Sequence, residues 1–173
     1  MLDSEAEKMA KKYLKLKEPI RLDIGGGTMP RWGFLSVDPY TKSDLPYSAT
    51  DLPLADDSVD EVYSSHSLEH FSKHEVPKVL GEIYRVLRPA HIFTVEVPDF
   101  VYCVREWMKT RDTGFNMDRV FGLQTDPGQA HKIGFTRDSL EGFLKGAGFE
   151  IVSFEYVWSH SQDCFLVVAK KPT

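Results

Sequence analysis

The sequence predicts an α/β fold in which a mostly parallel sheet of seven strands carries helices on both faces. Short apolar runs alternate with helix-patterned segments along most of the 173 residues, an order typical of parallel sheets. The last two runs are joined by a short polar segment. Because parallel neighbours need a long crossover, the last strand is predicted to be antiparallel. The chain length favours one domain over residues 1–173.

The first predicted element is a helix over residues 1–18. Ser4 and Glu7 form an S-x-x-E capping box at its start, and Pro19 ends it. One face of this helix is apolar and comprises Ala6, Met9, Ala10, Tyr13 and Leu14.

Seven apolar runs with strand character follow this helix. They cover residues 20–24, 34–37, 47–50, 59–65, 92–97, 150–157 and 164–169. Helical periodicity predicts further helices near 76–87, 100–111, 116–121 and 136–147. Ser72 with Glu75 and Thr136 are cap signals, and Gly148 is a stop signal. Asp99 is either the N-cap of the helix that follows it or a residue of a ligand crevice.

Composition excludes several classes of function. The net charge is −5 and the pI about 5.7, whereas a generic nucleic-acid binder carries a basic excess. No apolar run approaches the roughly 20 residues of a membrane span, and the first residues do not form a secretory signal. Cys103 and Cys164 lack metal-site spacing and are predicted to be free thiols, so a cytoplasmic location is expected.

The stretch from Arg21 to Asp38 has the layout of a nucleotide-type cofactor site. A short strand runs into Gly25, Gly26 and Gly27, and Asp38 ends the next apolar run. Glycines let a backbone approach a ligand closely, and a carboxylate can accept hydrogen bonds from a ribose. A dinucleotide site is disfavoured because Pro30 replaces the third glycine. A purely structural turn is the remaining alternative.

Two further segments favour a ligand site over a structural turn. Asp51-Leu52 and Ser64-Ser65-His66 each follow or end a predicted strand. Ligands of open α/β sheets bind outside the carboxyl ends of the strands, where these residues are expected to converge. A carboxylate and a backbone N–H at 51 and 52 suit the edge of an adenine ring.

At this point the chain resembles class I S-adenosylmethionine-dependent methyltransferases with a Rossmann-like, three-layer fold. The motifs are DIGGG (23–27), Asp38, DLPLADDSVDEVYSSHSLEH (51–70), EIYRVLRP (82–89) and the run from Gly122 to Val152. They are most similar to the small-molecule, type 11-like subgroup, which has a shortened first crossover. One departure is Pro89-Ala90-His91, where the subgroup usually has Pro-Gly-Gly.

The resemblance implies S-adenosylmethionine as cofactor and a role for each matching position. The glycine loop would contact the methionyl part and ribose, and Asp38 would bind the ribose diol. Asp23 would support the loop or make a water-mediated contact. Adenine would be covered by Pro39 or Tyr40 and read by Asp51 and Leu52. Ser65 and His66 would lie near the methionyl ammonium.

His66 and His131 are the candidate catalytic residues, since histidine can act as a base at neutral pH. The alternative for His131 is a solvated loop histidine, and His70 is expected to be structural. No metal site is expected, because the histidines lack ligand spacing. An NPPY-type sequence after the fourth strand is absent, which argues against methylation of nucleic-acid bases.

Residues 99–134 are the candidate substrate lid. They carry Phe100, Tyr102, Trp107, Phe115 and Phe121, which either line an acceptor pocket or form the core of a helical cover. Residues 100–137 contain six Lys or Arg and four Asp or Glu, a net +2. This charge favours an anionic small acceptor. The resemblance to the subgroup implies methyl transfer to a small-molecule acceptor, such as a sugar or polysaccharide precursor. The alternative is a cofactor- or protein-binding module without turnover.

Overall fold

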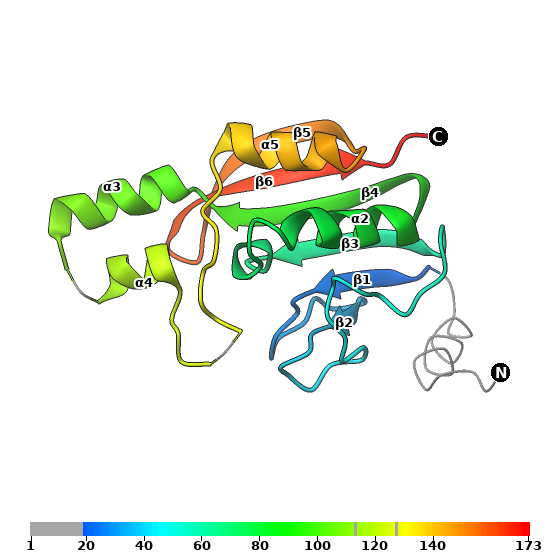
Figure 1. Cartoon of the computed structure of the whole chain (residues 1–173), viewed down its shortest axis with the longest axis horizontal. Coiled ribbons are helices and arrows are strands. Elements are labelled where there is room, and N and C mark those ends of the chain that lie inside the picture. The colour runs from blue at the N-terminus through cyan, green and yellow to red at the C-terminus, as the bar shows by residue number, and fades with distance from the viewer. Residues whose placement is uncertain (1–18, 113, 127) are drawn as a thin grey trace.

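The computed structural model describes residues 19–112, 114–126 and 128–173, so the helix expected over 1–18 lies outside the described residues. Within them one six-stranded sheet has the order β2-β1-β3-β4-β6-β5 (Figure 1). The strands are β1 (Arg21–Ile24), β2 (Leu35–Val37), β3 (Val59–Ser65), β4 (Leu87–Pro98), β5 (Glu150–Ser159) and β6 (Gln162–Lys170).

The strand directions confirm the predicted mixed sheet. β1 to β4 are parallel, whereas β6 is antiparallel to both of its neighbours, β4 and β5. β5 and β6 are joined by His160 and Ser161, whose φ angles are +48° and +62°. Two positive φ angles suit the right-handed twist of a tight hairpin, so the short connection produces the antiparallel last strand.

The prediction of seven strands is wrong for the described residues, because residues 47–50 do not form a strand. Near them, Leu45 makes only an isolated bridge to Val37. The backbone that follows is bound by side chains of a helix: the Leu52 N–H donates to Glu82 Oε2 at 2.8 Å, and the Leu52 carbonyl accepts from Arg85. Backbone groups satisfied in this way cannot pair in a sheet.

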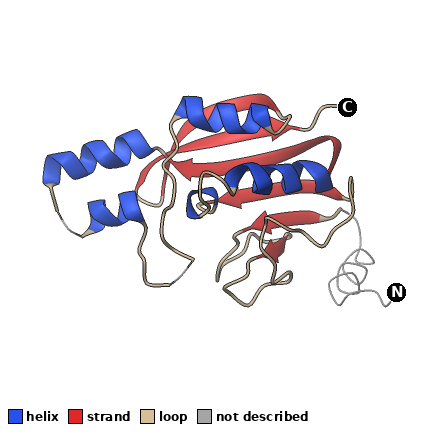
Figure 2. Ribbon diagram, in the orientation of Figure 1, coloured by secondary structure: helices blue, strands red, loops and turns tan. Residues whose placement is uncertain are grey.

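Four α-helices and one 3₁₀ helix, η1 (Leu68–His70), accompany the sheet within the described residues. The α-helices are α2 (Val76–Val86), α3 (Phe100–Thr110), α4 (Phe115–Phe121) and α5 (Arg137–Gly146). α2 and α5 lie against the same face of the sheet, and α3 and α4 extend beyond its edge (Figure 2). No helix among the described residues is both long and apolar enough to cross a membrane.

The hydrophobic core lies between the sheet and the α2–α5 layer. Phe93 and Val95 on β4 are fully buried there, together with Leu80 on α2 and Leu144 on α5. The helical layer expected on the opposite face is not formed by the described residues. Part of that face is covered instead by Arg31, whose guanidinium lies 4.3 Å from the ring centroid of Tyr63.

The predicted helix caps are largely present. Thr136 and Ser139 form a reciprocal capping box at the start of α5. Asp99 caps α3 by accepting hydrogen bonds from the N–H groups of Val101 and Tyr102, which confirms the N-cap interpretation. At α2 only half of the predicted box forms, because the Ser72 N–H donates to Glu75 without the reciprocal bond.

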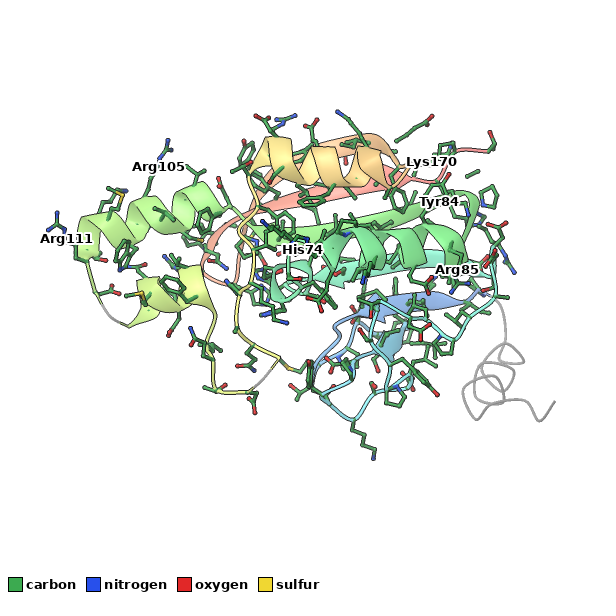
Figure 3. The ribbon with its side chains drawn as sticks, viewed as in Figure 1. His74, Tyr84, Arg85, Arg105, Arg111 and Lys170 are labelled. Carbon is green, nitrogen blue, oxygen red and sulfur yellow. The ribbon has the colours of Figure 1, made fainter. Side chains whose placement is uncertain are left out.

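We expect Arg85→Met to lower the free energy of unfolding by about 1.5–3 kcal/mol, the range for hydrogen bonds to a charged group. Arg85 donates to the carbonyls of Leu52 and Leu54 and pairs with Glu82. Urea unfolding measures the change. Arg105→Met is the matched control, because Arg105 points from α3 into solvent (Figure 3). Equal stability of the two variants would contradict the role given to Arg85.

Candidate active site

The carboxyl ends of the four parallel strands meet at one edge of the sheet, where the turn of the β5–β6 hairpin also arrives (Figure 1). Gly25 follows β1, Asp38 follows β2, His66 follows β3 and Asp99 follows β4. This is the edge where open α/β sheets bind their ligands. The parallel order therefore brings the predicted glycine loop, acidic residue and histidine together.

The glycine loop requires glycine at its first position. Gly25 has φ +72°, and its N–H donates to the Val37 carbonyl at 2.8 Å. A Cβ on Gly25 would lie only 2.3 Å from Ser67 Oγ. At Gly27, by contrast, a Cβ would meet nothing closer than the Gly25 carbonyl oxygen at 4.0 Å. The loop thus packs on the segment after β3 at one end and has room beside it at the other.

Asp23 packs against the glycine loop and binds the backbone that follows it. Its buried carboxylate accepts a hydrogen bond from the Arg31 N–H at 2.7 Å, and a Cβ on Gly26 would lie 3.0 Å from its Oδ2. Burial raises the pKa of Asp23, against the opposing effect of Arg31. This geometry is that of a residue supporting the loop.

Asp38 links the glycine loop to the turn that follows β2. Its Oδ1 accepts from the N–H groups of Tyr40 and Thr41 at 2.8 and 3.0 Å, and its Oδ2 accepts from the Gly27 N–H at 3.2 Å. A carboxylate can accept about four hydrogen bonds. Asp38 therefore retains room for one strong bond from a ligand hydroxyl in this conformation, and a second requires a weakened loop contact.

The residues expected to read adenine are arranged differently from the prediction. The Leu52 N–H already donates to Glu82, and the Leu52 side chain is buried in the core. The donor role predicted for this N–H is therefore corrected: it holds residues 50–54 on α2. The Asp51 side chain is exposed, and its contact with adenine stays a prediction.

Pro39 and Tyr40, the residues expected to cover adenine, are both exposed. The Tyr40 ring nevertheless has a neighbour, since a Cβ on Gly128 would lie 2.6 Å from Tyr40 Cδ2. The ring therefore packs on the loop that follows α4. It connects the Asp38 turn with the candidate lid.

His66 lies between two carboxylates at the end of β3. Its Nδ1 is 3.3 Å from Glu69 Oε1, and its Nε2 is 3.4 Å from Glu96 Oε1 and 3.6 Å from Cys164 Sγ. Burial opposes protonation, but the contacts with Cys164, Glu69 and Glu96 outweigh it and raise the pKa of His66. His66 is thus an imidazolium at neutral pH, which makes it unsuitable as a general base.

A cavity of about 350 Å³ lies beside His66. One wall comes from the sheet edge and η1 and includes Glu69 and His70. The other comes from Phe115, Asp118, Arg119, Gly122, Leu123, Gln129 and His131. Burial lowers the pKa of His131, so its ring is neutral at neutral pH. Of the two candidate catalytic histidines, only His131 therefore has a basic nitrogen available.

Comparison with known proteins identifies this arrangement. Residues 38–95, from the acidic residue after β2 through most of β4, match the family model described as a methyltransferase domain. Over these residues the chain is similar to methyltransferases of class I. S-adenosylmethionine is the cofactor of this class, in agreement with the glycine loop and Asp38.

Solved structures show the methyltransferase fold along nearly the whole chain. An S-adenosylmethionine-dependent methyltransferase from Methanosarcina mazei has a TM-score of 0.67 at 18% identity, covering 90% of this chain and 94% of that one. A possible histamine N-methyltransferase from Thermotoga maritima has a TM-score of 0.63 at 20% identity, covering 96% and 88%.

A third similar structure contains ligands. The 1,6-didemethyltoxoflavin-N1-methyltransferase from Burkholderia thailandensis, with 1,6-didemethyltoxoflavin and S-adenosylhomocysteine bound, has a TM-score of 0.61 at 16% identity. The alignment covers 98% of this chain and 77% of that one. No curated protein matches the chain in sequence.

The aromatic residues of the candidate lid take different places. Phe115 lines the cavity. Tyr102 packs against Trp158 with ring centroids 6.1 Å apart, a Cβ on Gly134 would lie 2.2 Å from the Phe100 ring, and Phe121 is exposed. Phe100 and Tyr102 therefore belong to the helical cover, and Phe115 is the lid aromatic that lines the cavity.

The sequence pattern did not identify Glu69, Glu96 or the cavity-facing position of His70. Glu69 and His70 lie in the LEH sequence of η1, and Glu96 is one of the last residues of β4. Two patterns in the sequence could have pointed to these residues. Glu96 is an acidic residue inside an otherwise apolar strand, and Glu69 stands directly before a histidine. Ser65, by contrast, lies as predicted at the end of β3, in register with Glu96.

We expect Gly25→Ala to lower the free energy of unfolding by about 2–5 kcal/mol. A left-handed φ costs a non-glycine residue roughly 1–2 kcal/mol, and overpacking typically adds 1–3. Urea denaturation measures the loss. The double variant Gly25→Ala/Ser67→Gly should recover only the steric part.

The control for this experiment is Gly81→Ala in α2, where an added Cβ meets no atom within 4 Å. This helix-interior change should raise stability by about 0.5–1 kcal/mol. If Gly25→Ala is as well tolerated as Gly81→Ala, the packing of the loop on Ser67 is not a real constraint.

Proposed function

We propose that the chain transfers a methyl group from S-adenosylmethionine to a hydroxyl-bearing small molecule, with sugars or sugar precursors as the preferred class. The observation that carries this proposal is the position of His66 and Ser67. Ser67 contacts the glycine loop, and His66 lines the acceptor-sized cavity. The adjacent residues His66 and Ser67 therefore separate the candidate cofactor site from the cavity and contact both.

The residues of the glycine loop fit S-adenosylmethionine. Space beside Gly27 admits a ligand close to the backbone, and Asp38 keeps hydrogen-bonding capacity for a ribose hydroxyl. When bound, this cofactor supplies a sulfonium methyl group that is already activated for transfer. The protein's task is then to orient the acceptor and exclude water, which can lower the barrier by roughly 7–11 kcal/mol.

The cavity suits a small polar acceptor. Its volume of about 350 Å³ lies within the range of small-molecule sites. Arg119 and Asp118 offer charged groups, and Phe115 and Leu123 offer apolar surface. The net +2 of residues 100–137 adds attraction for an acceptor that also carries an anionic group.

His131 is the side chain best placed to act on the acceptor. The raised pKa of His66 keeps it protonated, so it contributes positive charge rather than basicity. The lowered pKa of His131 leaves a lone pair on its ring for a proton or a metal ion. Such a group matters for a hydroxyl acceptor, for which general-base assistance typically contributes about 10²–10⁴-fold.

The setting that we propose is a reducing, cytoplasmic one without nucleic-acid or membrane partners. Cys103 and Cys164 are both free and buried, which agrees with a reducing compartment. The acidic net charge argues against nucleic acid.

We expect Asp38→Ala to weaken S-adenosylhomocysteine binding roughly 10–100-fold. Loss of one hydrogen bond to a charged group costs about 1.5–3 kcal/mol, and 1.4 kcal/mol corresponds to tenfold in affinity. Isothermal titration calorimetry measures the affinity. Asp138→Ala, at an exposed position in α5, should leave it unchanged.

Turnover is tested by following S-adenosylhomocysteine release with a panel of sugars, sugar acids and other small hydroxyl compounds. Methyl transfer to a member of this panel supports the proposed acceptor class. Tight cofactor binding without transfer to any compound in the panel would instead favour a binding module. Failure of the folded protein to bind either form of the cofactor would falsify the proposed function altogether.

A further inference from the structure

Three potential metal ligands meet in the cavity, outside the predicted cofactor contacts. Glu69 and His70 come from η1, and His131 comes from the loop after α4. One donor atom from each of these side chains lies within 4.8 Å of the other two. All three side chains line the cavity.

Backbone hydrogen bonds hold the two segments together. The N–H groups of Lys132 and Ile133 donate to the Glu69 carbonyl at 2.8 and 3.4 Å, and the His131 N–H donates to the Phe121 carbonyl at 2.9 Å. The carboxylate and the imidazole of His131 are thus brought together by a defined backbone arrangement.

The Glu69 carboxylate lacks the partners that its burial requires. The residue is 2% exposed, and neither carboxylate oxygen has an aligned hydrogen bond among the described residues. His66 is near only one of them, Oε1. Because buried polar atoms are normally hydrogen-bonded or metal-bound, Oε2 is left without a partner, even though the His66 imidazolium lies beside Oε1.

Both imidazoles are held as metal-binding histidines usually are. His70 Nδ1 is 3.2 Å from the Ala130 carbonyl oxygen, to which it can donate, leaving Nε2 as the ligand atom. The ring of His131 has a backbone partner at Val120. Metal-binding histidines commonly donate their second ring N–H to a backbone carbonyl, which fixes the tautomer and the ring orientation.

We propose that Glu69, His70 and His131 bind one divalent transition-metal ion. Two imidazoles and one carboxylate suit Zn²⁺ and other first-row ions such as Mn²⁺, Co²⁺ or Ni²⁺. Ligands at about 2.0–2.2 Å from a metal lie roughly 3–3.5 Å apart. Side-chain rotations that bring the donor atoms from within 4.8 Å of one another to this spacing therefore complete the site.

The role of this ion rests on the proposed methyl transfer, with His131 acting on the acceptor through the metal ion and not as a free base. Three protein ligands leave coordination positions open toward the cavity, as in catalytic metal sites. An acceptor hydroxyl bound there would be oriented and made more acidic. The ion would thus select acceptors with an oxygen ligand. It would also compensate the buried negative charge of Glu69.

A second group, formed by His66, Glu96 and His160, is the competing location. Its donor atoms are also within 4.8 Å of one another. There, however, His66 Nε2 is already 3.4 Å from Glu96, and His160 is exposed on the hairpin turn. We therefore assign the ion to Glu69 and use His160 to separate the two locations.

The test is calorimetric titration of chelator-treated protein with Zn²⁺, repeated with Co²⁺ while recording its visible absorption. We expect one ion per chain. Removal of an outer-shell partner typically costs 10–100-fold in metal affinity, so loss of a ligand in Glu69→Gln or His131→Ala should cost more than about 100-fold. His160→Ala and His74→Ala, the latter at an exposed position before α2 (Figure 3), should bind as the wild type does.

Two results overturn the proposal. One is a wild-type metal affinity no higher than that of Glu69→Gln and His131→Ala. The other is loss of metal binding in His160→Ala but not in His131→Ala.

Far-UV circular dichroism checks folding, and His70→Ala replaces Glu69→Gln if the latter does not fold. S-adenosylhomocysteine titration of each variant is a separate readout. If the protein binds S-adenosylhomocysteine but no metal ion, the metal site is rejected and the proposed function stands. If it binds the metal ion but not S-adenosylhomocysteine, the proposed function is rejected and the metal site stands.

Discussion

The ion pairs of His66 fix the geometry at the end of β3. This residue has a left-handed φ of +49°, which is unfavourable for any residue except glycine. Its ring lies between Glu69 of η1 and Glu96 of β4, so one cation joins three elements. Ser67 follows it and packs directly on Gly25. The position of the glycine loop and the shape of the cavity therefore both depend on this buried charge cluster.

Features that depend on local chemistry could be predicted from the sequence. The caps at Asp99 and Thr136 involve hydrogen bonds within three residues, and the antiparallel last strand follows from a connection too short for a crossover. The failed strand at 47–50 shows the opposite case. Its neighbourhood is organised by Glu82 and Arg85, about thirty residues away, which a local β-pattern cannot reveal.

The same distinction applies to the site. Gly25 and Asp38 lie where the parallel topology predicts, because strand order alone brings the ends of β1 and β2 together. The charge states of the histidines are set by tertiary contacts instead. Glu96 on the neighbouring strand β4 helps to raise the pKa of His66, and burial in the cavity lowers the pKa of His131. His131 meets Glu69 across 62 positions in the chain, so motif spacing could not reveal their contact.

The contact between Tyr40 and Gly128 has a thermodynamic consequence. Tyr40 follows the turn anchored by Asp38, whereas Gly128 belongs to the loop that continues into the cavity wall at Gln129 and His131. A ligand that shifts one loop must alter the packing of the other. Occupancy at the two places is then linked by a shared coupling free energy, and linkage is reciprocal. Binding at either place then changes the affinity at the other by the same factor.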